Sequence, residues 1–199
     1  MSGFKWLTIF ALLVAGALAG AAAIIASTEI NRLTATEAFC TSCHSMTFVA
    51  ADPHFKQSAH EGNIIGIRVG CSDCHIPPGN WFSETYTHAS MGIKDVIAEY
   101  THRFDDPAVW EKRRTELADE VRDEMRRYDS STCRKCHDAT AIVPSTEAGR
   151  AAHAMLQQKS MTCIDCHFNL VHAPVTPSAS FIRGSKLAVQ GKSAKGDAR

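Results

Sequence analysis

The sequence predicts a mainly α-helical protein in which one apolar N-terminal helix precedes a domain made of two similar halves. Three observations lead to this prediction: a long uncharged segment near the N-terminus, a repeated spacing of cysteine and histidine, and the lack of any strand pattern of useful length. With 199 residues, the chain is long enough for one ordinary domain or two small ones. The 21 basic residues balance 21 acidic ones, which excludes a strongly basic nucleic-acid-binding protein.

The uncharged segment runs from Leu7 to Ala26 and has only Thr8 as a polar residue. As a helix, its 20 residues would be roughly 30 Å long, which is the thickness of the hydrocarbon layer of a bilayer. The alternative is a signal peptide cleaved at Ala17-Leu18-Ala19, but the apolar region of a signal peptide usually ends sooner. We therefore expect an uncleaved membrane anchor over 7–26, with residues 1–6 in the cytoplasm.

All the cysteines fall into four C-x-x-C-H motifs, so none is left for a disulfide. This motif attaches c-type haem, because its two thiols bind the porphyrin edge and the adjacent imidazole reaches the iron. A zinc site would need no histidine after each cysteine pair, and a redox pair would not occur four times. We expect four covalently bound haems c on these eight cysteines: Cys40, Cys43, Cys71, Cys74, Cys133, Cys136, Cys163 and Cys166.

The spacing of the motifs repeats along the chain. In each half, a second histidine follows the first motif histidine by 16 residues, and nine or ten residues then precede the next motif. This predicts two pseudo-repeated dihaem halves, 40–75 and 133–167, joined by a helical insertion over 76–132. The recurring histidines, His60 and His153, are candidates for the sixth ligand of an iron.

Two further candidate ligands do not follow the repeat. His172 lies five residues after the last motif histidine, His167, and is a third candidate for a distal ligand. Met46 follows His44 by two residues, and only the first motif has a methionine at this position. A thioether ligand raises the potential of a haem, so the first haem is expected to differ from the others. Composition alone would favour the alternative that Met46 packs at the start of a helix.

Two helices are predicted between the halves. The first covers about 83–101 and places His88 and Asp95, seven residues apart, on one face. The second begins at Asp106-Pro107, an N-cap followed by proline, and continues to about Tyr128. The domain over 27–174 has little conventional core sequence, so the haems are expected to supply much of the buried volume. The segment 175–199 is polar, and a flexible tail is expected there.

These features resemble the NapC/NirT family of membrane-anchored tetrahaem quinol dehydrogenases, which includes the NrfH and TorC groups. The resemblance extends from the anchor to about Pro174, and the charged helix before Cys133 is part of it. The segments that carry it are Thr36–Cys40, Ser58–His60, Cys74–Pro78 and Cys163–His167 with His172. It implies an electron-transfer protein of the bacterial inner membrane with one membrane helix and a periplasmic domain. Such a protein takes electrons from menaquinol or ubiquinol and passes them to a periplasmic reductase of nitrate, nitrite, trimethylamine oxide or a similar substrate.

The resemblance also implies roles for the ligand candidates. The proximal ligands of haems two, three and four are His75, His137 and His167. The family pattern suggests that distal ligands are supplied across the two halves, with His60 on haem four, His153 on haem two and His172 on haem three. The protein ligand of haem one, beside the quinol pocket, is Met46 or His44.

In the quinol pocket, Asp95 matches an acidic residue of the family. The family has a lysine six or seven residues before this acid, where the present chain has Ala89 and His88. His88 or Lys94 is therefore expected to replace that lysine.

Two other functions fit part of the pattern. A multihaem reductase acting directly on a small substrate would need an exposed haem with an open coordination position and a polar substrate pocket, and the number of histidines argues against several open irons. A soluble electron carrier would result if the anchor were cleaved after Ala19.

Overall fold

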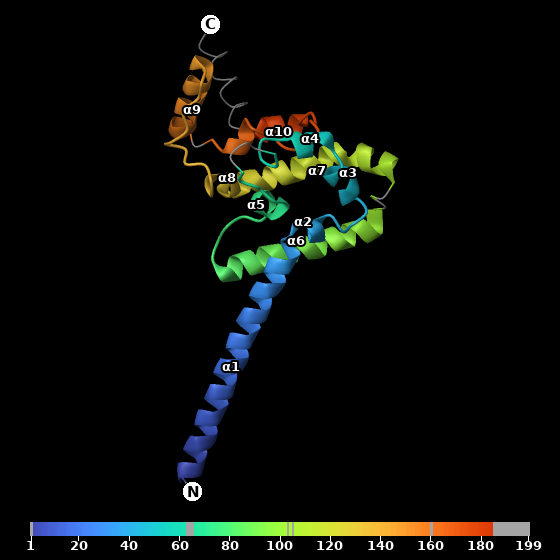
Figure 1. The fold of residues 1–199 in the computed structure, drawn as a ribbon. Helices are drawn as coiled ribbons and strands as arrows, with labels where there is room; N and C mark the ends of the chain where they lie inside the picture. The colour runs from blue at the N-terminus through green and yellow to red at the C-terminus, as the bar shows by residue number, and fades with distance from the viewer. Residues whose placement is uncertain (1, 63–65, 103, 105, 160, 185–199) are drawn as a thin grey trace.

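The structure, a computed structural model, describes residues 2–62, 66–102, 104, 106–159 and 161–184. Across these residues the regular structure is entirely helical. One long helix, α1 (Ser2–Thr34), projects away from a group of helices formed by the rest of the chain (Figure 1). The predicted mainly α-helical fold with one apolar N-terminal helix is confirmed, whereas the division into two repeated halves remains a prediction.

Helix α1 is longer than the predicted anchor. From Gly3 to Thr34 it is long and apolar enough to cross a membrane, and none of its most apolar part is buried inside the protein. Near its C-terminal end it contacts the next long helix, α6 (Trp81–His102), through side-chain hydrogen bonds. Trp81 Nε1 donates to Thr28 Oγ1 at 3.2 Å, and Asn31 Nδ2 donates to Thr85 Oγ1 at 2.8 Å.

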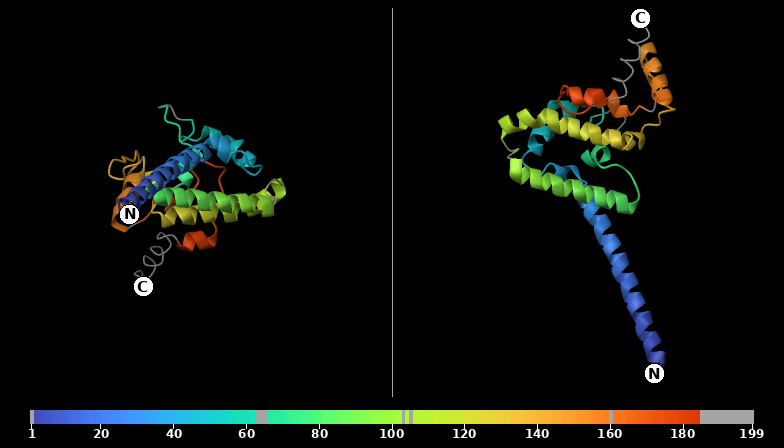
Figure 2. Two further views of the ribbon diagram at one scale, coloured as in Figure 1. Left: turned by 90° about the horizontal axis from the view of Figure 1, so that it is seen from below. Right: turned by 180° about the vertical axis from the view of Figure 1, so that it is seen from behind.

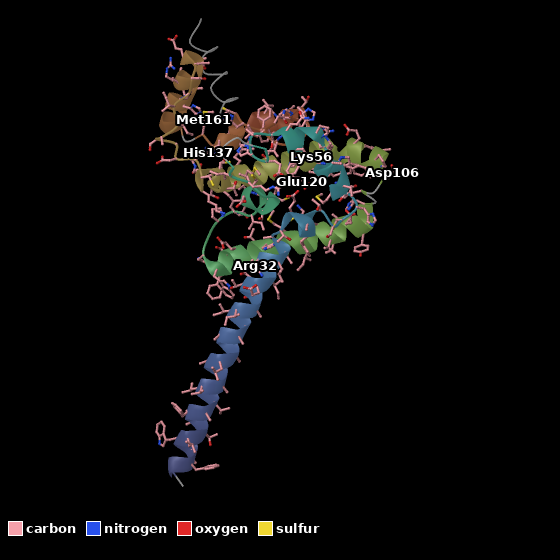
Figure 3. All side chains as sticks on the ribbon, viewed as in Figure 1. Arg32, Lys56, Asp106, Glu120, His137 and Met161 are labelled. Carbon is pink, nitrogen blue, oxygen red and sulfur yellow. The ribbon has the colours of Figure 1, made fainter. Side chains whose placement is uncertain are left out.

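Helices α6 and α7 (Pro107–Arg127) form two layers of the domain and agree with the two helices predicted between the halves. Asp106, at the start of α7 in Figure 3, caps the helix by accepting a hydrogen bond from the backbone N–H of Ala108 at 2.8 Å. Seen from the front and from behind, α6 lies nearer to α1 and α7 lies farther from it (Figures 1 and 2).

The remaining helices are short, and several carry the cysteine motifs. Helices α2 and α5 lie between α6 and α7, and α8 lies at the C-terminal end of α7 (Figures 1 and 2). The bounds are α2 (Glu37–Cys40), α3 (Met46–Ala50), α4 (Pro53–Gln57), α5 (Cys71–His75), α8 (Ser131–Arg134), α9 (Glu147–Lys159), the 3₁₀ turn η1 (Cys163–Asp165) and α10 (Ala179–Gly184).

The protein core is small. In the part of the chain that the structure describes, the buried hydrophobic side chains are Phe55, Phe104, Met161, Ile164 and Phe181. A domain of this length normally buries a far larger apolar set. The packing therefore agrees with the expectation that the haems supply much of the buried volume.

The C-terminal segment differs from the expected flexible tail over 175–199. Residues 179–184 form α10, and Phe181 is only 2% exposed. The guanidinium of Arg126 lies over the Phe181 ring at 4.1 Å, an interaction that a polar composition does not indicate. Residues 185–199, which belong to the same expectation, lie outside the described residues.

A buried arginine ties this segment to α7. Arg122 is 4% exposed and donates to Asp119 Oδ1 at 2.8 Å, Asn169 Oδ1 at 2.9 Å and the Val175 carbonyl at 2.8 Å. The other oxygen of Asp119 accepts a hydrogen bond from the backbone N–H of Ser178 at 2.9 Å. Removing the arginine would leave a buried carboxylate without its cation.

We therefore predict that Arg122→Ala lowers the free energy of unfolding of the haem-loaded protein by about 3 kcal/mol. The measurement is urea denaturation followed by circular dichroism. The matched control is Arg127→Ala on the same helix, because the Arg127–Glu124 pair is exposed on the arginine side and should contribute less than about 1 kcal/mol. Equal losses from the two substitutions would contradict this account.

Candidate haem sites

In motifs two, three and four, the backbone of each motif forms one tight turn. Motif two is the helix α5, which ends at the motif histidine. In motifs three and four, the N–H of the histidine donates to the carbonyl of the first cysteine, from His137 to Cys133 and from His167 to Cys163, at 2.9 Å in each case. The turn brings the two cysteines and the histidine of each motif together, as attachment to one porphyrin edge requires.

Motif one has a different backbone. Helix α2 ends at Cys40, and the next turn is formed by the N–H of Met46, which donates to the Cys43 carbonyl at 3.2 Å. The side chain of His44 is exposed, while Met46 is half-buried. This agrees with the expectation that the first haem differs from the others.

The cysteines that begin the motifs lie in pairs. The thiols of Cys40 and Cys71 are within hydrogen-bonding reach, and so are those of Cys133 and Cys163. All eight thiols are free of disulfides. The first motif is thus adjacent to the second and the third to the fourth, which is the neighbourhood that two dihaem halves require.

Three pairs of imidazole rings lie at similar separations. The ring centres are 6.3 Å apart for His75 and His172, 6.2 Å for His60 and His137, and 6.1 Å for His153 and His167. Two imidazoles on opposite sides of one metal ion have centres about 6 Å apart, because each metal–nitrogen bond is about 2 Å and each ring centre lies about 1 Å farther out. Each pair therefore has the separation that an iron between its two rings would need.

This pairing differs from the one that the resemblance implies. The structure places His172 beside motif two, His60 beside motif three and His153 beside motif four, so each distal candidate adjoins a different haem from the expected one. A hydrogen bond at 2.8 Å from the Ala173 N–H to Asp52 Oδ2 joins the chain next to His172 to the start of α4, and the ring of His172 stacks on Phe55 of that helix at 5.8 Å.

Motifs two and three are also held together. The Lys135 ammonium lies 3.1 Å from Asp73 Oδ1, so one variable residue of motif three pairs with one of motif two. A chain with two similar halves permits either pairing, and the tertiary contacts select between them.

The surroundings of these rings suit metal binding. Burial lowers the pKa of His75 to about 4 and also lowers the pKa of His172. A low pKa keeps an imidazole neutral, which is the form that binds a metal. In addition, Nδ1 of His153 is buried without a hydrogen-bond partner among the described residues. The donor set therefore fits haem iron with two histidine ligands.

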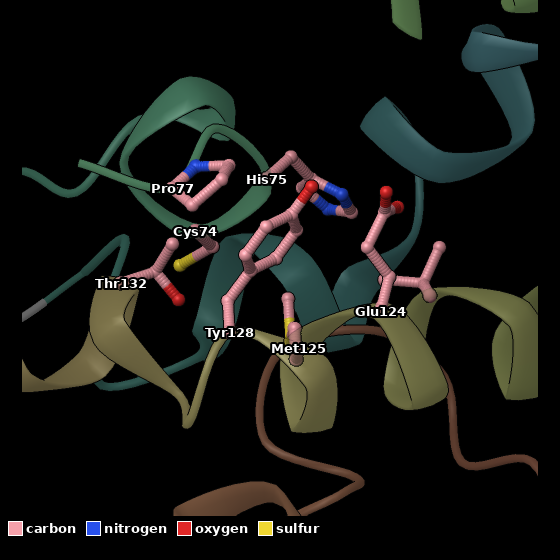
Figure 4. A pocket seen from close by; sticks show the side chains of 8 residues that line it. Cys74, His75, Pro77, Glu124, Met125, Tyr128 and Thr132 are labelled. Atoms are coloured by element: carbon pink, nitrogen blue, oxygen red, sulfur yellow. The ribbon is translucent and has the colours of Figure 1, made fainter. Parts of the chain in front are cut away.

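A small hollow adjoins motif two (Figure 4). Cys74 and His75 lie on one side of it, and Met125 and Tyr128 of α7 lie on the other. The mixture of a thiol, an imidazole and apolar walls is suited to a porphyrin edge.

A carboxylate from α6 holds the loop of motif one. Ser45, between His44 and Met46, is buried and donates to the two oxygens of Glu99 from its backbone N–H at 3.1 Å and from its hydroxyl at 2.5 Å. The sequence analysis did not identify Glu99. The spacing along the sequence could have indicated it, because Glu99 follows Asp95 by four residues and therefore lies on the same face of the helix.

The candidates for the quinol pocket separate into two positions. His88 Nε2 lies 3.3 Å from Thr34 Oγ1 at the end of α1, and Asp95 is close enough to Cys40 to affect its thiol electrostatically. Lys94 instead lies 3.5 Å from Glu120 on α7. Of the two residues that could replace the family lysine, His88 is the one beside α1 and motif one.

The electrostatics of Asp95 suit a group that accepts a proton. Although its side chain keeps contact with solvent, desolvation by the surrounding chain raises the pKa of this carboxyl. Lys94 opposes the rise, and Glu124 adds to it. The raised pKa makes Asp95 a stronger base than an ordinary aspartate.

Comparison with known proteins gives one family. The model of the NapC/NirT cytochrome c family, N-terminal region, matches residues 4–177. A probable tetraheme cytochrome c-type protein of Nitrosomonas europaea is 38% identical over 89% of the chain and 76% of its own length. NapC of Haemophilus influenzae is 32% identical over 70% of the chain and 68% of its own length.

TorC of Escherichia coli is 34% identical over 89% of the chain, but the matched region covers only 45% of TorC. No solved structure matches. The relatives named as tetraheme cytochromes confirm the expectation of four covalently bound haems c. With the apolar helix α1, the family indicates anchoring in the inner membrane. From the motifs, their geometry and the matched region together, the chain belongs to the NapC/NirT cytochrome c family.

Proposed function

We propose that the chain is a membrane-anchored tetrahaem cytochrome c that oxidises membrane quinol and passes the electrons to a periplasmic reductase. The observation that carries the proposal is the position of motif one, with Asp95 and His88 beside it, where α1 joins the rest of the chain. A lipid-soluble quinol reaches this place from the membrane without crossing the domain. The haems supply one-electron redox chemistry when they are bound.

The paired imidazoles are proposed as the axial ligands of three irons. His75 and His172 would hold haem two, and His137 and His60 haem three. His167 and His153 would hold haem four. Ligation by two histidines leaves no open position on an iron, so these sites are suited to electron transfer and not to binding a small substrate.

Met46 is proposed as the protein ligand of haem one in preference to His44. The exposed ring of His44 and the half-buried side chain of Met46 support this choice, as does the unusual turn of motif one. Glu99 would fix the loop between them by accepting both hydrogen bonds from Ser45.

A quinol releases two protons as it loses its electrons, and the chain must accept them. Asp95 is proposed to accept a hydrogen bond from one quinol hydroxyl and then its proton, with His88 oriented by Thr34 toward the same pocket. General bases of this kind contribute to catalysis by lowering the cost of proton transfer. The quinol would be menaquinol or ubiquinol.

The domain is proposed to face the periplasm, because c-type haems are attached outside the cytoplasmic membrane. The partner would be a reductase of nitrate, nitrite, trimethylamine oxide or a similar acceptor, in keeping with the names of the relatives.

The two alternative functions, a terminal reductase and a soluble electron carrier, have less support. A terminal reductase would need an open iron where the histidines are paired, and a soluble carrier would leave the long apolar part of α1, none of which is buried, without a role.

We predict that Asp95→Asn slows reduction of the haems by menaquinol in proteoliposomes by about 10²-fold, because the amide cannot accept the proton. The rate of the unchanged protein should fall as the pH falls through the raised pKa of Asp95, and the substitution should remove this dependence. The measurement is stopped-flow absorbance, and reduction by dithionite should stay unchanged. An unchanged rate with menaquinol at full haem content would rule out this role.

Substitutions of His88 and Lys94 then decide which of these two residues acts with Asp95. His88→Ala should slow the same reaction, while Lys94→Gln should have a smaller effect, because Lys94 lies next to Glu120. The reverse order would assign the role to Lys94.

A second prediction concerns the ligands. His60→Ala should increase the number of cyanide-binding haems by one per protein, because haem three would lose one axial ligand. In a protein that lacks haem three because of Cys133→Ala and Cys136→Ala, the same substitution should add no further cyanide-binding haem. An increase of one in that background would assign His60 to another haem, and mass spectrometry of the haem content is the control.

A further inference from the structure

Helix α6 has an apolar stripe that the proposed function does not use. The stripe follows helical spacing, and its large side chains are strongly exposed, at 76% for Phe82, 75% for Tyr86 and 85% for Tyr100. The other members are Ile93, Val96 and Ile97, which are also exposed. A continuous apolar surface of this kind on one helix marks a place where something apolar binds.

The stripe faces away from the rest of the domain. On its other sides, α6 is occupied: Glu99 accepts hydrogen bonds from Ser45, and Lys94 pairs with Glu120 of α7. At 100° per residue, Tyr86 and Ile93 lie on the side of the helix opposite Asp95. In Figures 1 and 2, α7 lies on one side of α6 and α1 leaves from the other.

The contacts between α6 and α1 show how far α6 lies from the hydrocarbon layer of the membrane. Trp81 and Thr85 bond to Thr28 and Asn31, which lie only a few residues beyond the apolar segment that ends at Ala26. Since a helix rises 1.5 Å per residue, the start of α6 lies within about 10 Å of the end of the hydrocarbon span.

The same stretch of α1 still presents apolar side chains to the outside. Ile30 and Leu33 are more than half exposed, and the exposed ion pair of Arg32 and Glu29 lies on the same turn of α1. Arg32 is at the junction of α1 and α6 in Figure 3. Apolar and charged side chains at one level are typical of the headgroup region of a bilayer.

We propose that α6 lies on the membrane surface as an interfacial helix, with the stripe Phe82, Tyr86, Ile93, Val96, Ile97 and Tyr100 in contact with lipid. The occupant is the outer part of the bilayer that α1 spans, and the apolar contact is continuous with that of α1 at Ile30 and Leu33. Aromatic residues at the ends of the stripe suit this region, where an apolar ring and a polar group are both accommodated.

This contact would hold the His88 and Asp95 pocket at the level of the headgroups. The proposal does not depend on quinol oxidation, because it concerns only what covers the stripe. A second copy of the chain is the competing occupant.

The test is photo-crosslinking of the full-length, haem-loaded protein in vesicles of phosphatidylethanolamine and phosphatidylglycerol. A benzophenone amino acid replaces Tyr86 in one variant and Tyr100 in another. The matched control replaces Lys94, which is exposed on a different face of the same helix, and a remote control replaces the exposed Val143. Haem absorbance confirms that each variant is folded, and mass spectrometry identifies the crosslinked product.

We expect lipid adducts at Tyr86 and Tyr100 in at least tenfold higher yield than at Lys94 or Val143. Yields at Tyr86 and Tyr100 that are no higher than those of the controls would overturn the proposal. So would crosslinks from these positions predominantly to a second copy of the chain, since the stripe would then be a contact between protein molecules.

Discussion

Three pairs of imidazole rings have centres about 6 Å apart, the spacing that one iron ion requires, and we propose that ligation of iron by these pairs is the constraint on which the rest of the structure depends. Two of the three pairs join segments that lie far apart in the sequence. His75 and His172 come from opposite ends of the domain, and His60 and His137 from different halves of the sequence. Because the described residues bury few large apolar side chains, these connections and the groups they hold take the place of a conventional core.

The features that the sequence predicted are those that depend on local spacing. Cysteine and histidine positions identified the four motifs, and an N-cap followed by proline identified the start of α7 at Asp106. The partners of the distal histidines could not be predicted in this way. His60 and His153 occupy equivalent positions in two similar halves, so spacing alone permits several pairings, and contacts such as Lys135 with Asp73 select among them.

Two other features required the tertiary structure for the same reason. Phe181 is a single aromatic residue in a polar segment, and the guanidinium of Arg126 above its ring and the bonds of Arg122 and Asp119 show why the segment packs. The periodicity of α6 predicted an amphipathic helix, but periodicity does not tell whether the apolar face meets protein or lipid. The contacts of Glu99 and Lys94 settle which sides of α6 face the domain.

The central claim is that each of haems two, three and four has two histidine ligands in a specific pairing. A cryo-electron microscopy map of the haem-loaded protein in a lipid nanodisc tests it most directly, because it identifies both residues on each iron. We predict His75 with His172, His137 with His60, and His167 with His153. A map with His60 on haem four and His153 on haem two would contradict the account.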